Sequence, residues 1–242
     1  MRHIIAPKHR LQSSVAILLG HRGANRVHLE NTMPAFIAAR QAGLSGIELD
    51  VQRTKDGVLI VHHDFHLPDG RLISALHFAQ LRLPEPYTIP TLEEVLTWAK
   101  QTGAYLNIEI KLETFATDGR EKEVATLVER SGIGNQIIIS SFNPISLLRI
   151  KYYAPSLETA LLFYNSKKNW LLDHGYLAFL LGVQAIHPHH SQVTLDMVLM
   201  AHRMGWKVNV WTVNEPEIVQ KLLALGVDGI IGDEPKVLLG QN

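Results

Sequence analysis

The stretch KVNVWTVNEPEIVQKLLALGVDGII, residues 207–231, contains a complete strand–helix–strand unit. Lys207–Trp211 is a short apolar run of β-forming residues, and Glu215–Leu225 has the spacing of apolar residues that is typical of a helix. Gly226 follows the helix where a left-handed residue commonly ends one, and Gly229–Ile231 begins a second apolar run. This succession predicts two parallel strands joined by a crossover helix.

The same alternation extends over the rest of the chain. Besides the two runs above, we expect strands at Val15–Leu19, Gly46–Val51, Ala104–Ile110, Gln136–Ser140, Glu158–Phe163 and Val183–Ile186. Further helical patterns lie between them, at Met33–Ala42, Thr91–Gln101, Glu121–Ser131, Ile145–Tyr152 and Leu195–Met204. Eight strands that alternate with helices predict an α/β fold and favour a single (β/α)8 TIM barrel over an open doubly wound sheet. The length of 242 residues suits one such barrel, so residues 1–242 are expected to form a single domain.

Several helix ends carry the residues that such ends require. Thr91 and Glu94 have the spacing of a capping box at the start of a helix. Gly43, Gly103 and Gly205 come just after helical patterns, where left-handed caps are expected. No Gly-x-Gly-x-x-Gly motif follows the first predicted strand, which argues against a dinucleotide-binding fold.

One long interruption, Phe65–Pro90, follows the second strand and a short hairpin. It contains several Pro and Gly residues and one short helical pattern near Leu76–Leu83. We expect a short loop insertion over one end of the barrel and no second domain.

Composition and charge exclude several classes of protein. Lys plus Arg and Asp plus Glu both number 23, so nothing indicates a nucleic-acid partner or an anionic membrane surface. The chain has no Cys, which excludes disulfides and fits a reducing compartment. The apolar run Val15–Leu19 is too short to cross a membrane and leads directly into His21. A cytoplasmic protein without a stable membrane anchor is therefore expected.

Polar residues stand where the apolar runs stop, which is where TIM barrels form their active sites. Glu48 and Asp50 lie two residues apart in one strand, so they point to the same face, and Glu109 and Lys111 share a face in the next strand. Three carboxylates on neighbouring strands suit one hard divalent cation, Mg2+ or Ca2+ first and Mn2+ next. The eighth strand ends in Gly232-Asp233.

The residues around these carboxylates supply the other parts of phosphodiester cleavage. His21 and His63 follow the first strand and the hairpin, and histidines transfer protons near neutral pH. Arg22 and Lys111 provide fixed positive charge for a phosphate oxygen. The sequence therefore predicts a metal-dependent phosphodiesterase.

Structural alternatives exist for each group. The alternative for the three carboxylates is a set of buried ion pairs with nearby basic side chains, but without a cation they would repel each other in one barrel mouth. The cluster His187-Pro188-His189-His190 lacks helical spacing, so we predict a loop at the pocket rim and no metal site. Trp211 follows a strand, where we expect it to form a wall of the pocket.

The motifs together resemble those of the glycerophosphodiester phosphodiesterase family. They occur in the family's order, as His21-Arg22-Gly23, Glu30-Asn31-Thr32, Ala35-Phe36, Gly46-Ile-Glu48-Leu-Asp50-Val51, Thr54-Lys55-Asp56-Gly57, Val61-His-His63-Asp64, Asn107-Ile-Glu109-Ile-Lys111, Ser141-Phe142, Trp211-Thr-Val-Asn214 and Gly226-Val-Asp228-Gly229-Ile. The resemblance covers the chain from about residue 18 to residue 236.

The resemblance implies a TIM barrel with one divalent cation and assigns roles to individual residues. Glu48, Asp50 and Glu109 match metal ligands, and His21 and His63 match the catalytic pair. Further matches are residues that meet the phosphate or line the pocket, namely Arg22, Lys111, Asn31 and Trp211. The implied reaction, part of glycerol and lipid metabolism, is hydrolysis of a small glycerophosphodiester to sn-glycerol 3-phosphate and an alcohol. It proceeds by attack of the substrate's 2-hydroxyl and a cyclic phosphate.

Three departures from the family pattern concern the pocket. Leu29 stands where the family usually has Pro, and Gly232 stands where it often has Thr. The segment after His63-Asp64 is shorter than in many members. Two alternative functions remain beside hydrolysis of small glycerophosphodiesters. One is a lysophospholipase D that acts on lipids, and the other is a non-catalytic barrel that binds phosphorylated ligands. The sequence does not distinguish a monomer from a homodimer.

Overall fold

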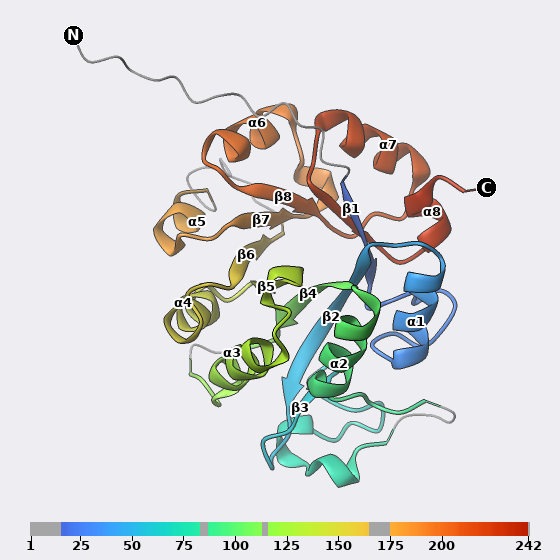
Figure 1. Cartoon of the computed structure of the whole chain (residues 1–242), viewed down its shortest axis with the longest axis vertical. Coiled ribbons are helices and arrows are strands. Elements are labelled where there is room, and N and C mark those ends of the chain that lie inside the picture. The colour runs from blue at the N-terminus through green and yellow to red at the C-terminus, as the bar shows by residue number, and fades with distance from the viewer. Residues whose placement is uncertain (1–15, 83–86, 113–115, 165–174, 242) are drawn as a thin grey trace.

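The computed structural model describes residues 16–82, 87–112, 116–164 and 175–241, which form a closed parallel barrel with helices around it (Figure 1). Its strands are β1 (Ile17–His21), β2 (Gly46–Arg53), β4 (Tyr105–Ile110), β5 (Ile137–Ser141), β6 (Glu158–Phe163), β7 (Ala185–Pro188), β8 (Lys207–Val210) and β9 (Gly229–Gly232). They pair in chain order, and β1 closes the barrel by pairing with both β2 and β9. The predicted (β/α)8 TIM barrel is confirmed.

The helices lie on the outside of the barrel, where all but the last connect one strand to the next (Figure 1). They are α1 (Met33–Gln41), α2 (Leu92–Thr102), α3 (Arg120–Ser131), α4 (Pro144–Tyr153), α5 (Tyr176–Leu181), α6 (Leu195–Arg203), α7 (Pro216–Leu225) and α8 (Pro235–Leu239). The short helices α5 and α8 were not predicted. The capping box of Thr91 and Glu94 forms at the start of α2, and Gly103 ends this helix with a positive φ. No helix in the described part of the chain is long and apolar enough to cross a membrane.

Strand β2 shows how the sequence builds both the barrel wall and its interior. Ile47, Leu49 and Val51 are buried in the main hydrophobic core, while the residues between them are polar. Gly46 lies opposite Tyr105 of β4, and a Cβ atom there would be 1.8 Å from the Tyr105 carbonyl oxygen. Only glycine therefore permits this close approach of β2 and β4.

The insertion after β2 begins with a hairpin and has a small core of its own. Strand β3 (Leu59–Val61) pairs with β2 in antiparallel orientation, as the predicted hairpin requires. An apolar cluster then holds the insertion together, formed by Ile60, Leu67, Ile73, Leu81 and Ile89. In place of one short helix near Leu76–Leu83, the described residues form two 3-10 helices, Ile73–Ala75 and Phe78–Gln80. Leu83 lies outside the described residues.

Two predicted strands start too early in the sequence. Strand β1 is shifted toward His21 relative to the predicted Val15–Leu19, and Val15 lies outside the described residues. Strand β7 begins at Ala185, two residues after the predicted Val183. This second shift places His187 inside a strand.

Candidate active site

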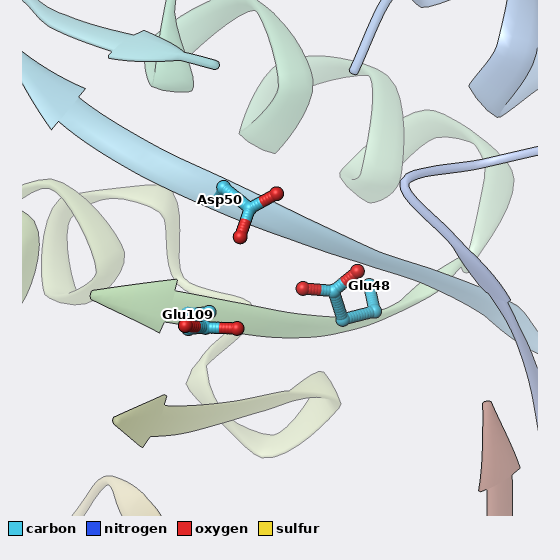
Figure 2. A group of neighbouring side chains, drawn as sticks. All are labelled: Glu48, Asp50 and Glu109. Carbon is cyan, nitrogen blue, oxygen red and sulfur yellow. The ribbon is translucent and has the colours of Figure 1, made fainter. Parts of the chain in front are cut away.

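The three predicted carboxylates meet inside the barrel, two on the middle of β2 and one near the carboxyl end of β4 (Figure 2). Glu48, Asp50 and Glu109 each offer one oxygen atom, and these atoms all lie within 4.8 Å of one another. The strand register explains this, because Asp50 lies opposite Glu109. All three side chains are buried.

The carboxylates differ in how their charge is compensated. Burial raises the pKa of Glu48 well above its ordinary value, and the charges of Asp50 and Glu109 raise it further. Burial and the charge of Asp50 also raise the pKa of Glu109, to about 7. Burial alone would raise the pKa of Asp50, but Lys111 and Arg22 hold it below its ordinary value. The protein's own cationic side chains therefore stabilise the ionised form of one carboxylate, Asp50. A bound metal cation would allow all three carboxylates to ionise.

The chemistry of the donor atoms fits a hard divalent cation. Carboxylate oxygens are the ligands that Mg2+, Ca2+ and Mn2+ prefer. Asn107 of β4 lies opposite Glu48, and its Oδ1 atom is buried without a hydrogen-bond partner. The site thus offers oxygen ligands and one further unsatisfied amide oxygen beside them.

Two basic residues lie directly against this carboxylate group. The Nζ atom of Lys111 is 2.8 Å from Glu109 and 3.3 Å from Asp50. The Nε atom of Arg22 is 3.2 Å from Asp50, and its Nη1 atom donates two hydrogen bonds to Glu30, at 2.9 and 3.0 Å. Both charged groups therefore lie beside the carboxylates, and both line the pocket described below.

The backbone around Arg22 is unusual. Arg22 and Asn31 both have a positive φ, 57° and 55°, which non-glycine residues adopt at a cost. The Arg22 amide donates to Glu48 at 3.0 Å, and the Asn31 side chain donates to Asp50 at 2.9 Å. Gly23 beside them is required, since a Cβ atom there would lie 2.7 Å from the carbonyl carbon of Ala35 in α1. This turn therefore orients two of the three carboxylates.

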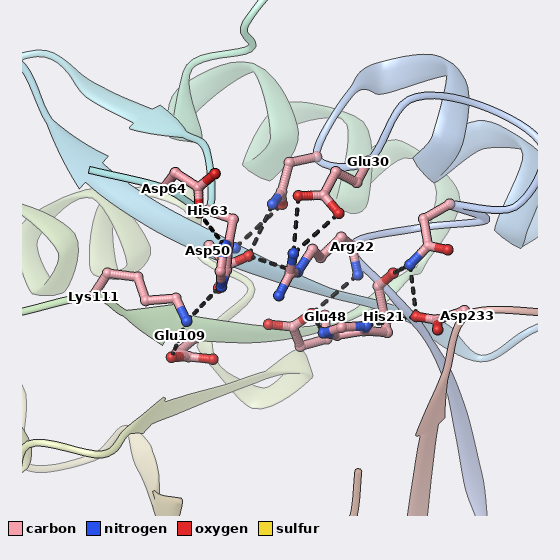
Figure 3. A network of polar contacts seen from close by, with 12 residues as sticks. His21, Arg22, Glu30, Glu48, Asp50, His63, Asp64, Glu109, Lys111 and Asp233 are labelled. Carbon is pink, nitrogen blue, oxygen red and sulfur yellow. Dashed lines mark hydrogen bonds and ion pairs between the residues drawn. The ribbon is translucent and has the colours of Figure 1, made fainter. Parts of the chain in front are cut away.

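His21 lies at one end of the polar network, beside Glu48 and Asp233 (Figure 3). Its Nδ1 atom is 2.6 Å from Oδ1 of Asp233, and its Nε2 atom is 4.0 Å from Glu48. Burial alone would raise the pKa of Asp233, but hydrogen bonds from His21, Asn25 and Asn214 hold it well below its ordinary value. Asp233 is therefore ionised and accepts the Nδ1 proton of His21, which leaves Nε2 facing the site.

His63 lies at the opposite end, beside Lys111 and Asp50 (Figure 3). Its Nδ1 atom is 2.7 Å from Oδ1 of Asp64, whose side chain is 74% exposed. The two histidines thus flank the carboxylates from different sides. The two histidines also differ in the carboxylate that each one contacts, because Asp233 beside His21 is much less exposed than Asp64 beside His63.

A pocket of about 200 Å3 opens between these groups. Seven of the nine predicted site residues line it, namely His21, Arg22, Glu48, His63, Glu109, Lys111 and Trp211. Asp50 and Asn31 are buried beside it and hold the lining residues in place. Trp211 packs edge to face against Phe142 at a ring distance of 5.5 Å, so the predicted aromatic wall is present.

The prediction for His187 was wrong, since this residue does not lie at the rim. It is fully buried in β7, and its Nε2 atom is 2.9 Å from the Asn209 side chain. Burial lowers the pKa of His187 to about 3, so it is neutral. His189 and His190 lie farther out, where His189 packs against Trp211. The cause is the late start of β7, which places His187 in the barrel interior.

Asp233 is the main residue that sequence reasoning missed. Its position after the last strand was the signal, since polar residues at strand ends define the site. The neighbouring Gly232 is explained by packing, because a Cβ atom there would lie 2.2 Å from the Val213 carbonyl oxygen. The Asn214 side chain accepts a hydrogen bond from the Asp233 amide at 2.9 Å, so the turn is fixed without a hydroxyl at position 232.

Comparisons with known proteins show what the whole barrel is similar to. The model of the glycerophosphoryl diester phosphodiesterase family matches residues 21–237. A glycerophosphodiester phosphodiesterase of Caldanaerobacter subterraneus subsp. tengcongensis is 32% identical over 239 residues, which cover 92% of this chain and 96% of the relative. One of Bacillus altitudinis is 32% identical over 237 residues, covering 90% and 94%.

Solved structures show the same similarity. A phosphodiesterase of Oleispira antarctica in complex with the product sn-glycerol-3-phosphate superposes with a TM-score of 0.78 at 25% identity, covering 93% of this chain and 95% of the other. A glycerophosphodiester phosphodiesterase of Thermotoga maritima has a TM-score of 0.76 at 26% identity, covering 94% and 98%.

The barrel and the comparisons define the class of this protein as a TIM-barrel phosphoric diester hydrolase. Within that class, the chain belongs to the glycerophosphoryl diester phosphodiesterase family. The family resemblance that the motifs indicated is confirmed.

Proposed function

We propose that this protein hydrolyses glycerophosphodiesters to sn-glycerol 3-phosphate and an alcohol, in a metal-dependent reaction that uses His21 and His63. The observation that carries the proposal is the placement of these two histidines on opposite sides of a buried carboxylate group, within one pocket (Figure 3). The bound product named for the Oleispira antarctica enzyme supports the choice of substrate.

Glu48, Asp50 and Glu109 would hold one divalent cation, Mg2+ or Ca2+ in preference to Mn2+. When bound, the cation supplies Lewis acidity toward a phosphate oxygen and the attacking hydroxyl. The protein's own residues contribute charge as well. Lys111 and Arg22 line the pocket and neutralise negative charge that develops on the phosphate.

The histidines move the protons in this proposal. The substrate's 2-hydroxyl attacks phosphorus while one histidine takes its proton, and the other histidine protonates the departing alkoxide. A cyclic phosphate and the free alcohol result. Water then opens the cyclic phosphate with the histidine roles reversed, giving sn-glycerol 3-phosphate. Asp233 holds His21 in the tautomer whose Nε2 atom can exchange a proton.

Two variants test this function directly. We expect His21→Ala and His63→Ala to lower kcat for glycerophosphocholine by ~10²–10⁴-fold with the fold intact by circular dichroism. Release of sn-glycerol 3-phosphate is the measured quantity. His202→Ala is the matched control, since His202 also pairs with an aspartate, Asp228, at 2.9 Å but does not line the pocket. Near-wild-type turnover by either site variant would overturn the assignment.

Chelation tests the cation separately. Treatment with EDTA should abolish turnover, and added Mg2+, Ca2+ or Mn2+ should restore it. Full activity after chelation would contradict metal dependence. A non-catalytic barrel is the weaker rival, because a binding module does not need a pair of proton-transferring groups.

A further inference from the structure

A second pocket of about 440 Å3 adjoins the candidate active site. The two pockets share three lining residues, Glu109, Lys111 and Phe142, so they adjoin each other beside the carboxylate group. The rest of the second pocket is mainly apolar. The apolar residues that line it are Phe65, Leu112, Phe142 and Pro144, together with Ile110, which is itself buried in the main core.

The polar side chains in this second pocket bond to its own backbone. The Ser141 hydroxyl donates to the Ile110 carbonyl at 2.9 Å and accepts from the Asn143 amide at 3.0 Å. The Asn143 side chain donates to the Leu112 carbonyl at 3.3 Å and accepts from the Ile145 amide at 3.0 Å. Apart from the end at Glu109 and Lys111, the described residues therefore offer a ligand mainly apolar surface in this pocket.

The sizes of the two pockets indicate what each can hold. The site pocket, at about 200 Å3, is smaller than the ~300–1,000 Å3 that enclose a drug-sized ligand. It suits the glycerol phosphate part of a substrate. The second pocket, at about 440 Å3, falls inside that range. A group attached to the phosphate beside Lys111 would extend into it.

We propose that the second pocket binds the leaving alcohol, and that this enzyme prefers glycerophosphodiesters whose alcohol has an apolar body. This inference rests on the proposed function and narrows its substrate class. It also places the leaving alcohol on the side of Lys111 and His63, because Lys111 lines both pockets and His63 lies beside Lys111 in the site pocket (Figure 3). Polar alcohols such as ethanolamine or glycerol would leave the apolar walls uncovered.

A homologous series of substrates tests the proposal. Ethyl, butyl and hexyl esters of sn-glycerol 3-phosphate have leaving alcohols of nearly equal acidity, so differences in kcat/KM report on binding. Burying a methylene group is worth up to about fourfold. We expect the hexyl ester to exceed the ethyl ester by about 10-fold or more in kcat/KM. A ratio below about twofold, or a preference for glycerophosphoethanolamine, would overturn the proposal.

The Phe65→Ser variant locates the effect. We expect it to reduce the hexyl-to-ethyl ratio by about threefold or more, because part of the apolar wall is lost. The ratio is independent of the fraction of folded enzyme, so loss of stability would not imitate the result. Leu72→Ser is the control, since Leu72 lies in the same insertion, is 41% exposed and does not line the pocket. An unchanged ratio in Phe65→Ser would contradict the assignment.

Two further measurements separate the possible failures. A 1-hexanoyl lysophosphatidylethanolamine places the apolar chain on the glycerol, and a gain for this substrate without a gain for the hexyl ester would overturn the proposed occupant. Calorimetry of the ethyl and hexyl esters with metal-loaded His63→Ala measures binding without turnover. Tighter binding of the hexyl ester would support the proposed alcohol pocket. If the wild type hydrolysed no diester, only the proposed function would be overturned. Equal affinities for the two esters would contradict binding of the leaving alcohol in the second pocket.

Discussion

The Nδ1 atom of His21 lies 2.6 Å from Oδ1 of Asp233, and this contact joins the ends of the first and last strands of the barrel. His21 ends β1, and Asp233 directly follows β9. Asn25 and Asn214 donate further hydrogen bonds to the same carboxylate, at 2.6 and 2.5 Å. Closure of the barrel thus assembles a fixed support for one of the two proposed proton-transferring groups.

Replacing Asp233 should impair catalysis more than binding. We expect Asp233→Asn to lower kcat by about 10- to 100-fold with little change in KM, because the carboxylate no longer fixes the His21 tautomer or stabilises its protonated form. Steady-state kinetics with glycerophosphoethanolamine measures this split. Asp233 acts here as a positioning residue, through His21.

Asp228→Asn provides a matched control. Asp228 accepts a hydrogen bond from His202 at 2.9 Å, so the substitution also removes a carboxylate from a His–Asp pair. The pair lies outside the pocket, and we expect kcat within about twofold of wild type. An equal loss in both variants would indicate a general structural effect and contradict the proposed role of Asp233.

The proposed place of the leaving alcohol assigns the roles of the two histidines. If the alcohol leaves beside Lys111, His63 is the group that protonates it. A 4-nitrophenyl ester needs no such proton, because its leaving group is stable as an anion. In the first turnover, which forms the cyclic phosphate, we expect His63→Ala to release 4-nitrophenol at a rate within about 10-fold of wild type but to lose ~10²–10⁴-fold on alkyl esters. His21→Ala should lose both activities. If His21→Ala kept the 4-nitrophenyl activity and His63→Ala lost both activities, His21 would be the group that protonates the leaving alcohol.

Most of the barrel follows from local features of the sequence. Strands, helices and caps are defined by neighbouring residues, so apolar runs such as Gly46–Val51 and the capping box at Thr91 were predicted correctly. Two-residue alternation also placed Glu48 beside Asp50 and Glu109 beside Lys111. These predictions needed no knowledge of the closed barrel.

The remaining features depend on contacts between distant residues. The His21–Asp233 pair spans 212 positions and exists only because β1 lies beside β9. His187 became a core residue because β7 begins two residues later than its apolar run suggested. The pairing of Arg22 with Glu30 requires the left-handed turn at Arg22, which the sequence does not reveal. Such contacts follow from packing of the whole chain.

Gly232 should not tolerate a side chain. A Cβ atom would lie 2.2 Å from the Val213 carbonyl oxygen and 2.9 Å from Leu238 Cδ2. We expect Gly232→Ala to lower the free energy of unfolding by about 1–3 kcal/mol, measured by urea denaturation. Gly134→Ala is the control, because its Cβ would meet only the flexible Leu157 side chain, at 3.1 Å. Equal stability of the Gly232→Ala and wild-type proteins would refute the packing explanation.

The stabilisation that a divalent cation gives this protein should increase with pH. Without a cation, the pKa of Glu109 is about 7 in the folded protein, above the ordinary 4.5, because the group is buried beside Asp50. The folded state therefore binds more protons than the unfolded state between these values, and ionisation of Glu109 destabilises the fold as pH rises toward 7. A cation binds the ionised carboxylates and removes this penalty.

By calorimetry we expect saturating Mg2+ or Ca2+ to raise Tm by several degrees near pH 8 and by much less near pH 5.5. Glu109→Gln, which cannot ionise, should show a smaller shift with weaker pH dependence. Equal wild-type shifts at both pH values would contradict cation binding at these carboxylates.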